Sequence, residues 1–320
     1  MPKVSVLMCS YNHIHYLPSA LDSVLSQQGV DFEVVIVDDA STDGSQKYLA
    51  KIKDSRVKIV LREKNQGVCR TANEAYLLTS GEYIAPMSSD DVWIKNKLRV
   101  QCEVLDSNPG VMAVFSTATI IDKNGTRLPA QGHPFHSFKL SRNDLFGLFF
   151  SGRNVLCAAS EMMRRSALGP APFYDIRCLQ IQDMEQHMRL LLQGELAILP
   201  NVLVQYRTHG ENLSTPTALA MTRHVFELPI ILEHFLEIHE IKQIRAILPD
   251  ESIPDSVEDE LLPFIWGRAA MHNPKGNYVS RLWGYSVIRD VMASDARARA
   301  IEEHFGFTLQ DYYNLVSAFG

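Results

Sequence analysis

The sequence is poor in cysteine, and its cysteines form no recognisable pair. There are five of them in 320 residues, an odd number, and none stands in a C-x-x-C arrangement. An odd count without such pairs argues against a disulfide framework and against a thiolate zinc site. It is typical of a protein kept in a reducing compartment.

The chain also lacks an excess of positive charge and a long apolar run. Its 31 Lys and Arg are outnumbered by 37 Asp and Glu, a net charge of −6, so we expect no binding of nucleic acid as a polymer. A mildly acidic protein still binds a nucleotide when a metal ion supplies positive charge. No run approaches the roughly 18 apolar residues that span a bilayer, and the apolar segment after Met1 is too short for a signal peptide. We therefore expect a cytoplasmic protein, with peripheral contact at the inner face of the membrane left open.

Glycine is absent from the turn that follows the first apolar segment. Residues 10–15 read SYNHIH. A dinucleotide-dependent oxidoreductase needs the pattern G-x-G-x-x-G at this place, and a nucleotidyltransferase needs a glycine-rich phosphate loop near the N-terminus. The sequence therefore disfavours both enzyme classes.

The N-terminal third of the chain does contain a regular alternation of two periods. Apolar runs typical of buried strands, at 4–9, 32–37, 57–61 and 83–87, are each followed by apolar residues at helical spacing. Such alternation predicts an α/β fold in which a mostly parallel sheet is flanked by helices on both faces.

The pattern changes further along the chain. Residues 111–121 predict a longer strand closed by an Asn-Gly turn, and 129–144 have prolines and no period, which predicts a mobile loop. A helix is expected over 184–192, and strand material over 196–206. From 216 to 320 the signal is helical.

Paired aspartates follow two of the predicted strands. Asp38 and Asp39 end the second run, and Asp90 and Asp91 stand just past the fourth. The carboxyl ends of parallel strands meet at one edge of the sheet, where open α/β folds bind nucleotides. Adjacent carboxylates repel each other, and a hard divalent cation relieves that repulsion. The pairs indicate a metal-containing nucleotide site; the alternative for Asp90 and Asp91 is an acidic pair at a helix N-terminus.

In their order and spacing, the motifs of the chain resemble the family 2 glycosyltransferases, which have a GT-A fold. The segments that carry the resemblance are VSVLMCSYN at 4–12, VDDASTDG at 37–44, NQG at 65–67, SDDVW at 89–93, QDME at 182–185 and YRTHGENLS at 206–214. The resemblance implies a GT-A domain over 1–215, with a nucleotide-sugar half at 1–110 and an acceptor half at 111–215. Residues 216–320, which carry none of these motifs, are expected to form a helical C-terminal region.

The resemblance implies which residues hold the nucleotide. Tyr11, with Asn12 beside it, is expected to stack on the base, and the alternative is a rim tyrosine packed on the next helix. Asp39 is expected to accept a hydrogen bond from a pyrimidine ring N–H, whereas Asp38 alternatively caps the next turn. Gly67 is expected to let the backbone approach the sugar nucleotide; the alternative is a plain turn.

A divalent cation, Mn²⁺ or Mg²⁺, is also implied. Asp91 is expected to bind it, while Asp90 contacts the ribose or a metal-bound water. His209 is expected to ligate the metal or orient the diphosphate, and Arg207 to grip a phosphate oxygen. The alternatives are a structural role for His209 and a surface salt bridge for Arg207. Many relatives have a further aspartate where this chain has Ser88, so we expect fewer protein ligands than usual.

Asp183 resembles the catalytic base of the family. One carboxylate that takes the proton of an acceptor hydroxyl, with a cation that neutralises the leaving diphosphate, suffices for inverting transfer in a single displacement. The alternative is a helix cap. The expected activity moves a sugar from a nucleotide-diphosphate donor, UDP-linked by prior expectation, to a glycan or lipid-linked acceptor in cell-surface polysaccharide or glycan assembly. The competing hypothesis is a non-catalytic sugar-nucleotide-binding or scaffold protein of the same fold.

The C-terminal helical region has several possible roles. It either packs on the catalytic domain, forms a homodimer, selects the acceptor, or docks on a membrane that carries lipid-linked acceptors. The membrane alternative rests on aromatic and basic residues that occur together in the sequence, namely Trp266, Trp283, Tyr285, Arg268 and Arg281.

Overall fold

A mixed sheet of eight strands forms the centre of the N-terminal part of the protein. The computed structural model describes residues 1–129 and 139–319. The strands are β1 (Val4–Ser10), β2 (Phe32–Asp38), β3 (Val57–Leu61), β4 (Tyr83–Ser88), β5 (Val92–Trp93), β6 (Val111–Ile121), β7 (Met162–Arg164) and β8 (Glu195–Arg207). Their order across the sheet is β3-β2-β1-β4-β7-β6-β8-β5.

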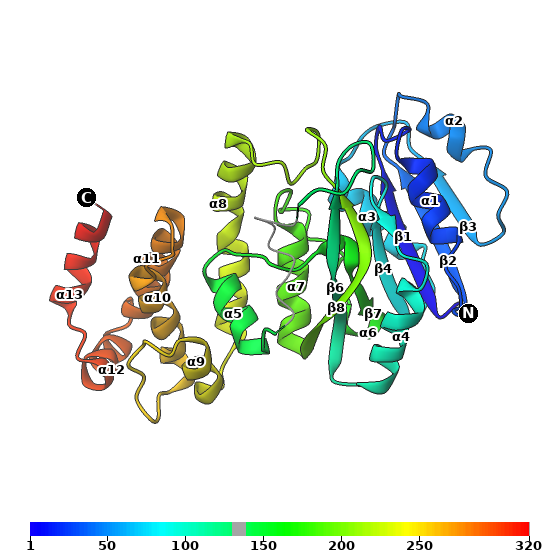
Figure 1. The fold of residues 1–320 in the computed structure, drawn as a ribbon. Helices are drawn as coiled ribbons and strands as arrows, with labels where there is room; N and C mark the ends of the chain where they lie inside the picture. Colours follow the sequence, from blue (N-terminus) through cyan, green and yellow to red (C-terminus); the bar gives the residue numbers. More distant parts are fainter. Residues whose placement is uncertain (130–138, 320) are drawn as a thin grey trace. The chain divides into compact units, whose positions relative to one another are not determined.

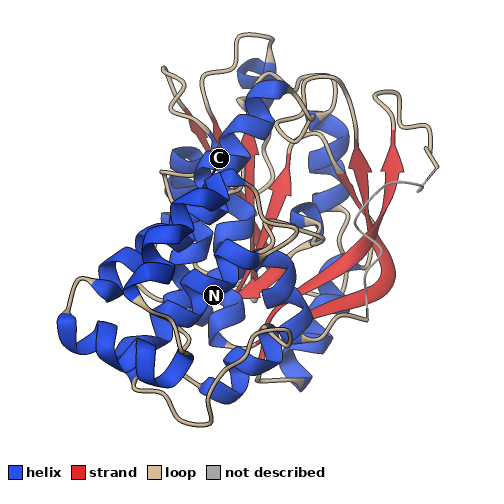
Figure 2. Ribbon diagram, turned by 90° about the vertical axis from the view of Figure 1, so that its left-hand side faces the viewer, coloured by secondary structure: helices blue, strands red, loops and turns tan. Residues whose placement is uncertain are grey.

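Helices connect the strands and continue beyond them to the C-terminus. The helices are α1 (Leu17–Leu25), α2 (Ser45–Leu49), α3 (Val68–Leu77), α4 (Lys97–Ser107), α5 (Arg142–Phe150), α6 (Arg165–Leu168), α7 (Gln182–Gln193), α8 (Ala218–Glu233), α9 (Ile241–Ile247), α10 (Leu262–His272), α11 (Tyr278–Met292), α12 (Asp295–Phe305) and α13 (Leu309–Asn314). Short 3₁₀ helices lie at Ala158–Ser160, His234–Glu237, Asp259–Leu261 and Leu315–Phe319. Figure 2 distinguishes the helices from the strands.

The first four strands confirm the predicted parallel arrangement. β1 lies between β2 and β4 and is parallel to both, and β2 is parallel to β3. Beyond β4 the sheet is mixed, because β7 runs antiparallel to both β4 and β6. The predicted fold class, a mostly parallel sheet flanked by helices with a helical C-terminal region, is confirmed.

Successive side chains of the buried strands point to alternate faces of the sheet and pack against helices there. Val4, Val6 and Met8 of β1 belong to the same buried cluster as Leu17 of α1 and Leu98 of α4. Figure 1 shows α7 on the opposite side of β6 from α4. Because successive strand residues point to opposite faces, a strand covered on both sides reads as a continuous apolar run.

A bulge interrupts the pairing of β8 with β6. The register passes from Ser116 opposite Leu199 to Thr117 opposite Val202, so Pro200 falls in the irregular stretch. Proline has no N–H to donate to a ladder, and bulges are among the places where a sheet tolerates it. The Thr117 hydroxyl donates a hydrogen bond of 3.2 Å to the Pro200 carbonyl oxygen. The strand predicted at 196–206 therefore forms in spite of its proline.

The prediction of a loop over 129–144 is wrong at its C-terminal end, where a helix begins. Residues 130–138 lie outside the described part of the chain, but α5 already begins at Arg142. Ser141 and Asp144 form a reciprocal capping box: Ser141 Oγ accepts from the Asp144 N–H, and Asp144 accepts from the Ser141 N–H. Such a box satisfies two otherwise unpaired donors at a helix start.

The chain divides into two compact units. Residues 1–140 and 155–215 form the first, and residues 141–154 join 216–320 in the second. In the second unit an aromatic cluster surrounds the fully buried Trp266, whose ring centroid lies 5.0 Å from that of Phe235 and 5.5 Å from that of Phe150. None of the helices in the described part of the chain combines the length and the apolar character that crossing a bilayer requires.

The tryptophans that suggested membrane docking are buried. Trp266 and Trp283 both lie in the core, and Tyr285 stacks on Tyr312 with ring planes only 8° apart. A membrane anchor needs its ring at the surface, so these tryptophans do not support the membrane alternative. The sequence places them together, but only the packing of α10 and α11 shows that they face inward.

Glu33 of β2 ties the sheet to the turn before β4, and we expect it to make stability depend on pH. Its carboxylate accepts from Ser5 Oγ, from the Ser80 N–H and hydroxyl, and from Lys58 Nζ. Burial raises the pKa of Glu33, but these donors outweigh burial and lower it from 4.5 to about 2. A depressed carboxylate pKa gives stability that is present above pH 4.5 and is lost as the pH falls towards 2.

Replacing Glu33 with glutamine is therefore expected to lower the melting temperature by about 5 °C at neutral pH, the effect of losing about 2 kcal/mol of charged hydrogen bonding. The difference from the wild type should shrink between pH 4.5 and pH 2. Glu63→Gln, at an exposed position, is the matched control and should change little. A pH-independent difference would contradict the assignment.

Candidate functional site

The carboxyl edge of the sheet brings together loops that are far apart in the sequence. Ser10 of β1 lies beside Asp38 of β2, and Cys9 lies beside Ser88 of β4, so the residues after these strands emerge side by side. β8 ends at the same place, because the backbone N–H of Arg207 donates to Asp91 Oδ1 at 2.7 Å. In open α/β sheets, this edge is where ligands bind.

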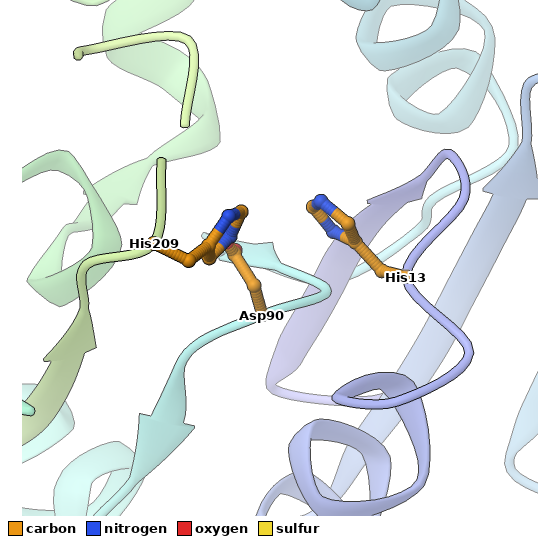
Figure 3. Close-up of side chains that lie close together, drawn as sticks. All are labelled: His13, Asp90 and His209. Atoms are coloured by element: carbon orange, nitrogen blue, oxygen red, sulfur yellow. The ribbon is translucent and has the colours of Figure 1, made fainter. Parts of the chain in front are cut away.

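Three side chains from three of these loops point into the same space (Figure 3). They are His13 after β1, Asp90 after β4 and His209 after β8; one ring nitrogen of each histidine and one Asp90 oxygen all lie within 4.8 Å of one another. His209 Nε2 is 3.0 Å from Asp90 Oδ2. The two imidazole rings meet edge to face, with centroids 5.5 Å apart.

This donor set fits a divalent cation. Imidazole nitrogens and a carboxylate oxygen are ligands that transition metals accept. Burial lowers the pKa of His13, which favours the neutral ring that a metal ligand must be. His13 Nδ1 lies 2.8 Å from Ser89 Oγ, a contact of the kind that fixes the orientation of a ligating ring. The Asn212 side-chain amide donates to Asp90 Oδ2 at 3.2 Å and supports the carboxylate in the same way.

Asp91, the metal ligand predicted from the sequence, is not one of the three residues of this cluster. Its residue is only 2% exposed, and it accepts the hydrogen bond from Arg207 at the end of β8. Burial, and next the neighbouring Asp90, raise the pKa of the Asp91 carboxyl. Among the described residues, it is Asp90 rather than Asp91 that shares a candidate metal cluster with His209.

Arg207 is buried at the end of β8 and is held by backbone carbonyl groups of two other segments. Its residue is 6% exposed, and its Nε donates to the backbone carbonyl of Asp90 at 2.6 Å. Its Nη1 donates to the carbonyl of Asp122 at 3.1 Å, and its guanidinium lies 4.9 Å from the Tyr16 ring centroid. The same Tyr16 ring stacks on His209 at 5.0 Å. Arg207 thus braces the loop that carries Asp90, and Tyr16 lies between the two side chains from the end of β8.

Asp39 fastens the loop that contains Gly67. Its Oδ1 accepts from the Gln66 N–H at 2.9 Å and from Arg62 Nη1 at 3.0 Å, and its Oδ2 accepts from the Gly67 N–H at 2.8 Å. Gly67 has a φ of +87°, which only glycine adopts freely, and an added Cβ would meet no atom within 4 Å. Conformation rather than crowding therefore requires this glycine, and the space beside it is open.

Asn12 and Asp38 shape the two loops beside Tyr11. Asn12 Oδ1 accepts from the Thr42 N–H at 2.8 Å, and its own N–H donates to Ser41 Oγ at 2.8 Å. Asp38 accepts from both the N–H and the hydroxyl of Ser41, as the turn-capping alternative for this residue predicts. Tyr11 is 47% exposed, so about half of the residue is open to solvent beside these loops.

Asp183 lies on α7, a separate element, and contributes no atom to the metal cluster. It is the second residue of that helix, half-buried, and its Oδ1 accepts from the Met184 N–H at 2.8 Å. The residue at the cap position is Ile181. A carboxylate in the first helical turn interacts favourably with the helix dipole.

His13 and Tyr16 are the site residues that the sequence does not single out. A lone histidine or tyrosine after a strand has no spacing that marks it as a ligand or a packing partner. The sequence indicates these two residues only by their position, because both belong to the loop that follows the first strand, next to Tyr11. Only the fold shows that this loop faces the end of β8.

The fold and its edge site define a class: an α/β protein of the nucleotide-binding type with a candidate cation site among its strand-end loops. Within that class, the family model described as glycosyl transferase family 2 matches residues 5–169. TuaG of Bacillus subtilis, assigned to teichuronic acid biosynthesis, is 30% identical over 217 residues, which are 67% of this chain and 82% of TuaG. The chain belongs to glycosyl transferase family 2, as the order of its motifs predicts.

Solved structures share the fold at lower identity. Residues 1–349 of TarS from S. aureus, in complex with UDP-GlcNAc, superpose with a TM-score of 0.61 at 17% identity, covering 99% of this chain and 91% of TarS. The mannosyltransferase PcManGT from Pyrobaculum calidifontis, in complex with GDP-Man and Mn²⁺, superposes with a TM-score of 0.52 at 17% identity, covering 99% and 86%. These likenesses establish the fold.

Proposed function

We propose that the protein is a metal-dependent glycosyltransferase that moves a sugar from a nucleotide-diphosphate donor to an acceptor hydroxyl in the assembly of a cell-surface glycan. The observation that carries the proposal is the convergence of His13, Asp90 and His209 at the carboxyl edge of the sheet in a family 2 chain. Support comes from neighbours of the same fold that hold UDP-GlcNAc, or GDP-Man with Mn²⁺, and from TuaG, assigned to the biosynthesis of a polysaccharide.

His13, Asp90 and His209 are the residues that would hold the cation. Two imidazole nitrogens and one carboxylate oxygen would be the protein's ligands to the cation, and the diphosphate would complete the set. A cation bound there neutralises the charge that develops on the leaving diphosphate. Asp91 and Arg207 then have supporting roles, because each fixes the chain around Asp90 through the bonds that join β8 to the loop after β4.

The nucleotide would lie between the loops after β1, β2 and β3. The exposed ring of Tyr11 suits stacking on the base, and Asn12 holds that loop against its neighbour. Asp39 fixes the turn at Gly67, where the open backbone permits close approach of the donor. A carboxylate has about four acceptor sites, so Asp39, with three in use, can also accept a base N–H.

Asp183 is proposed as the general base. It takes the proton of the acceptor hydroxyl as that oxygen forms a bond to the anomeric carbon, and the bond from this carbon to the diphosphate breaks on the opposite side. The electron pair of the broken bond stays on the diphosphate, and the configuration at the anomeric carbon inverts. Only one protein carboxylate is needed, because the leaving group departs without a proton.

The ligand set predicts a preference among metals. Imidazole nitrogen suits Mn²⁺ better than Mg²⁺, which prefers oxygen ligands throughout. Replacing His13 with glutamine should weaken Mn²⁺ binding by about tenfold or more and Mg²⁺ binding by less. Isothermal titration of each metal into the protein, in the presence of UDP, measures both affinities.

His15→Gln is the matched control, because His15 is an exposed histidine in the same loop and is not part of the cluster. It should leave both affinities unchanged. Equal effects of His13→Gln on the two metals, or an equal effect of the two substitutions on Mn²⁺, would remove His13 from the ligand set.

Activity itself is tested by following release of nucleoside diphosphate from UDP-glucose, UDP-GlcNAc and GDP-mannose with added Mn²⁺. A family 2 enzyme should release nucleotide from one of these donors slowly in water and faster with an added acceptor. A non-catalytic sugar-nucleotide-binding protein, the competing function, would bind a donor and release nothing under either condition.

A further inference from the structure

A group of three ionisable side chains lies together in the core of the first unit, away from the metal cluster. They are Lys97 of α4, Glu161 just before β7, and His187 of α7, each with an exposed fraction of 0%. Glu161 Oε2 is 3.5 Å from His187 Nε2. Lys97 Nζ donates to the backbone carbonyl of Glu161 at 3.1 Å and to Gln101 Oε1 at 2.8 Å.

The Glu161 carboxylate and the His187 ring face each other at ion-pair distance in the core. Within the described residues, neither carboxylate oxygen of Glu161 and neither ring nitrogen of His187 has a hydrogen-bond partner. Burial lowers the pKa of His187, but Glu161, with Asp183 and Glu185, acts in the opposite direction, and the net change in the pKa is upward. Burial lowers the pKa of Lys97 to about 7, against the opposing effect of Glu161. Three apolar side chains of similar size would stabilise the core at least as well as this buried ionisable cluster. Stability therefore does not explain why the protein has the cluster, and a functional reason is needed.

The cluster joins the two parts of the proposed active site. Lys97 Nζ lies 4.0 Å from the ring centroid of Trp93, which belongs to β5, directly after the loop of Asp90. Trp93 Nε1 donates to the Ala159 carbonyl, in the turn that leads to Glu161. On the other side, His187 follows Asp183 by one turn of α7. Glu161 therefore lies between the segment that follows the metal loop and the helix that carries the proposed base.

We propose that Glu161 is a positioning residue for the transfer reaction: its buried carboxylate, paired with His187, holds α7 so that Asp183 is aimed at the acceptor hydroxyl. The proposal rests on the proposed function. Phe115 of β6 packs edge-on against the His187 ring at 4.8 Å, which leaves the ring little freedom other than to face Glu161. The other titratable groups that act on this pair are Lys97, Tyr174, Asp183 and Glu185.

The test is Glu161→Gln, which keeps the shape of the side chain and removes its charge. We expect kcat to fall by about tenfold or more, whereas KM for the donor and stabilisation by UDP with Mn²⁺ stay unchanged, because a misplaced base affects the chemical step alone. If Glu161 acts through His187, the double variant with His187→Gln should lose no more than the worse single variant.

Glu185→Gln is the matched control. Glu185 lies on the same helix and pairs with Arg189, so this change also weakens α7 but leaves the Glu161–His187 pair intact. An unchanged kcat in Glu161→Gln, equal losses in Glu161→Gln and Glu185→Gln, or additive losses in the double variant would each overturn the proposal. If Glu161→Gln does not fold, Glu161→Asp takes its place in the same cycle and is judged by the same outcomes.

Amide hydrogen exchange separates this proposal from the proposed function. Glu161→Gln should speed exchange in residues 183–193 of α7 whether or not the protein is shown to transfer a sugar. Failure of the wild type to release nucleotide would contradict the proposed function. Unchanged exchange in α7 would contradict the role of Glu161.

Discussion

Replacing Asp183 with asparagine is expected to lower kcat by about a thousandfold while leaving binding of the donor intact. Asparagine keeps the size of the side chain and an oxygen that can accept the Met184 N–H, but it cannot take a proton. Loss of a general base typically costs between a hundredfold and about ten thousandfold in rate. The measurement is nucleotide release at saturating donor and acceptor, together with the melting temperature in UDP and Mn²⁺.

The control for this substitution is Asp175→Asn. Asp175 is a half-buried carboxylate that precedes α7 and pairs with Arg177, so it tests whether removal of any charge near this helix slows transfer. Its kcat should stay close to that of the wild type. Unimpaired turnover in Asp183→Asn would remove Asp183 as the base, and lost donor binding would mean that it contacts the nucleotide instead.

The second large effect is expected at the aspartate pair, where the two residues should differ. Asp90→Ala removes the only carboxylate of the metal cluster found among the described residues, and we expect Mn²⁺ affinity to fall by at least about a hundredfold, more than the loss of an outer partner costs. Asp91→Asn can still accept the Arg207 N–H and should keep most of the metal affinity. Isothermal titration of Mn²⁺ into both variants measures the contrast.

The melting temperature of each variant completes that comparison. Asp91→Asn puts a neutral side chain where burial disfavours the charged carboxylate and can still accept the Arg207 N–H, so it should change the melting temperature little. Asp90→Ala removes the acceptor of the His209 ring and of the Asn212 amide and should lower the melting temperature more. The opposite pattern, with metal binding lost in Asp91→Asn and retained in Asp90→Ala, would restore the assignment of Asp91 as the ligand.

The sequence predicts the parallel half of the sheet well, because strands buried on both faces read as continuous apolar runs. The strands expected at 4–9, 32–37, 57–61 and 83–87 are confirmed as β1 to β4. The short strands β5 and β7 are not predicted, since two or three residues carry no period. The grouping of 141–154 with the C-terminal helices is likewise not visible in the sequence, because it arises from packing between distant segments.

The site is predictable to the level of the loops but not of the side chains. The motifs place Asp90, Asp91 and His209 in segments that meet at the carboxyl edge of the sheet, yet they do not show which aspartate faces the histidine. That choice depends on how the segment after β4 meets the end of β8, where Asp91 accepts from the Arg207 backbone and Asp90 faces His209. His13 completes the cluster only because the loop after β1 meets the end of β8, a long-range contact that no local pattern records.

The most direct test of the account is the melting temperature of the wild type and of Asp90→Ala with UDP or GDP, each with and without Mn²⁺. A ligand present at a hundred times its dissociation constant stabilises a protein by about 2.7 kcal/mol, which is a shift of several degrees. We predict that one nucleotide raises the melting temperature of the wild type only when Mn²⁺ is present, and that Asp90→Ala shows no such rise. The account would be contradicted if neither nucleotide stabilised the wild type with or without the metal, or if Asp90→Ala responded as the wild type does.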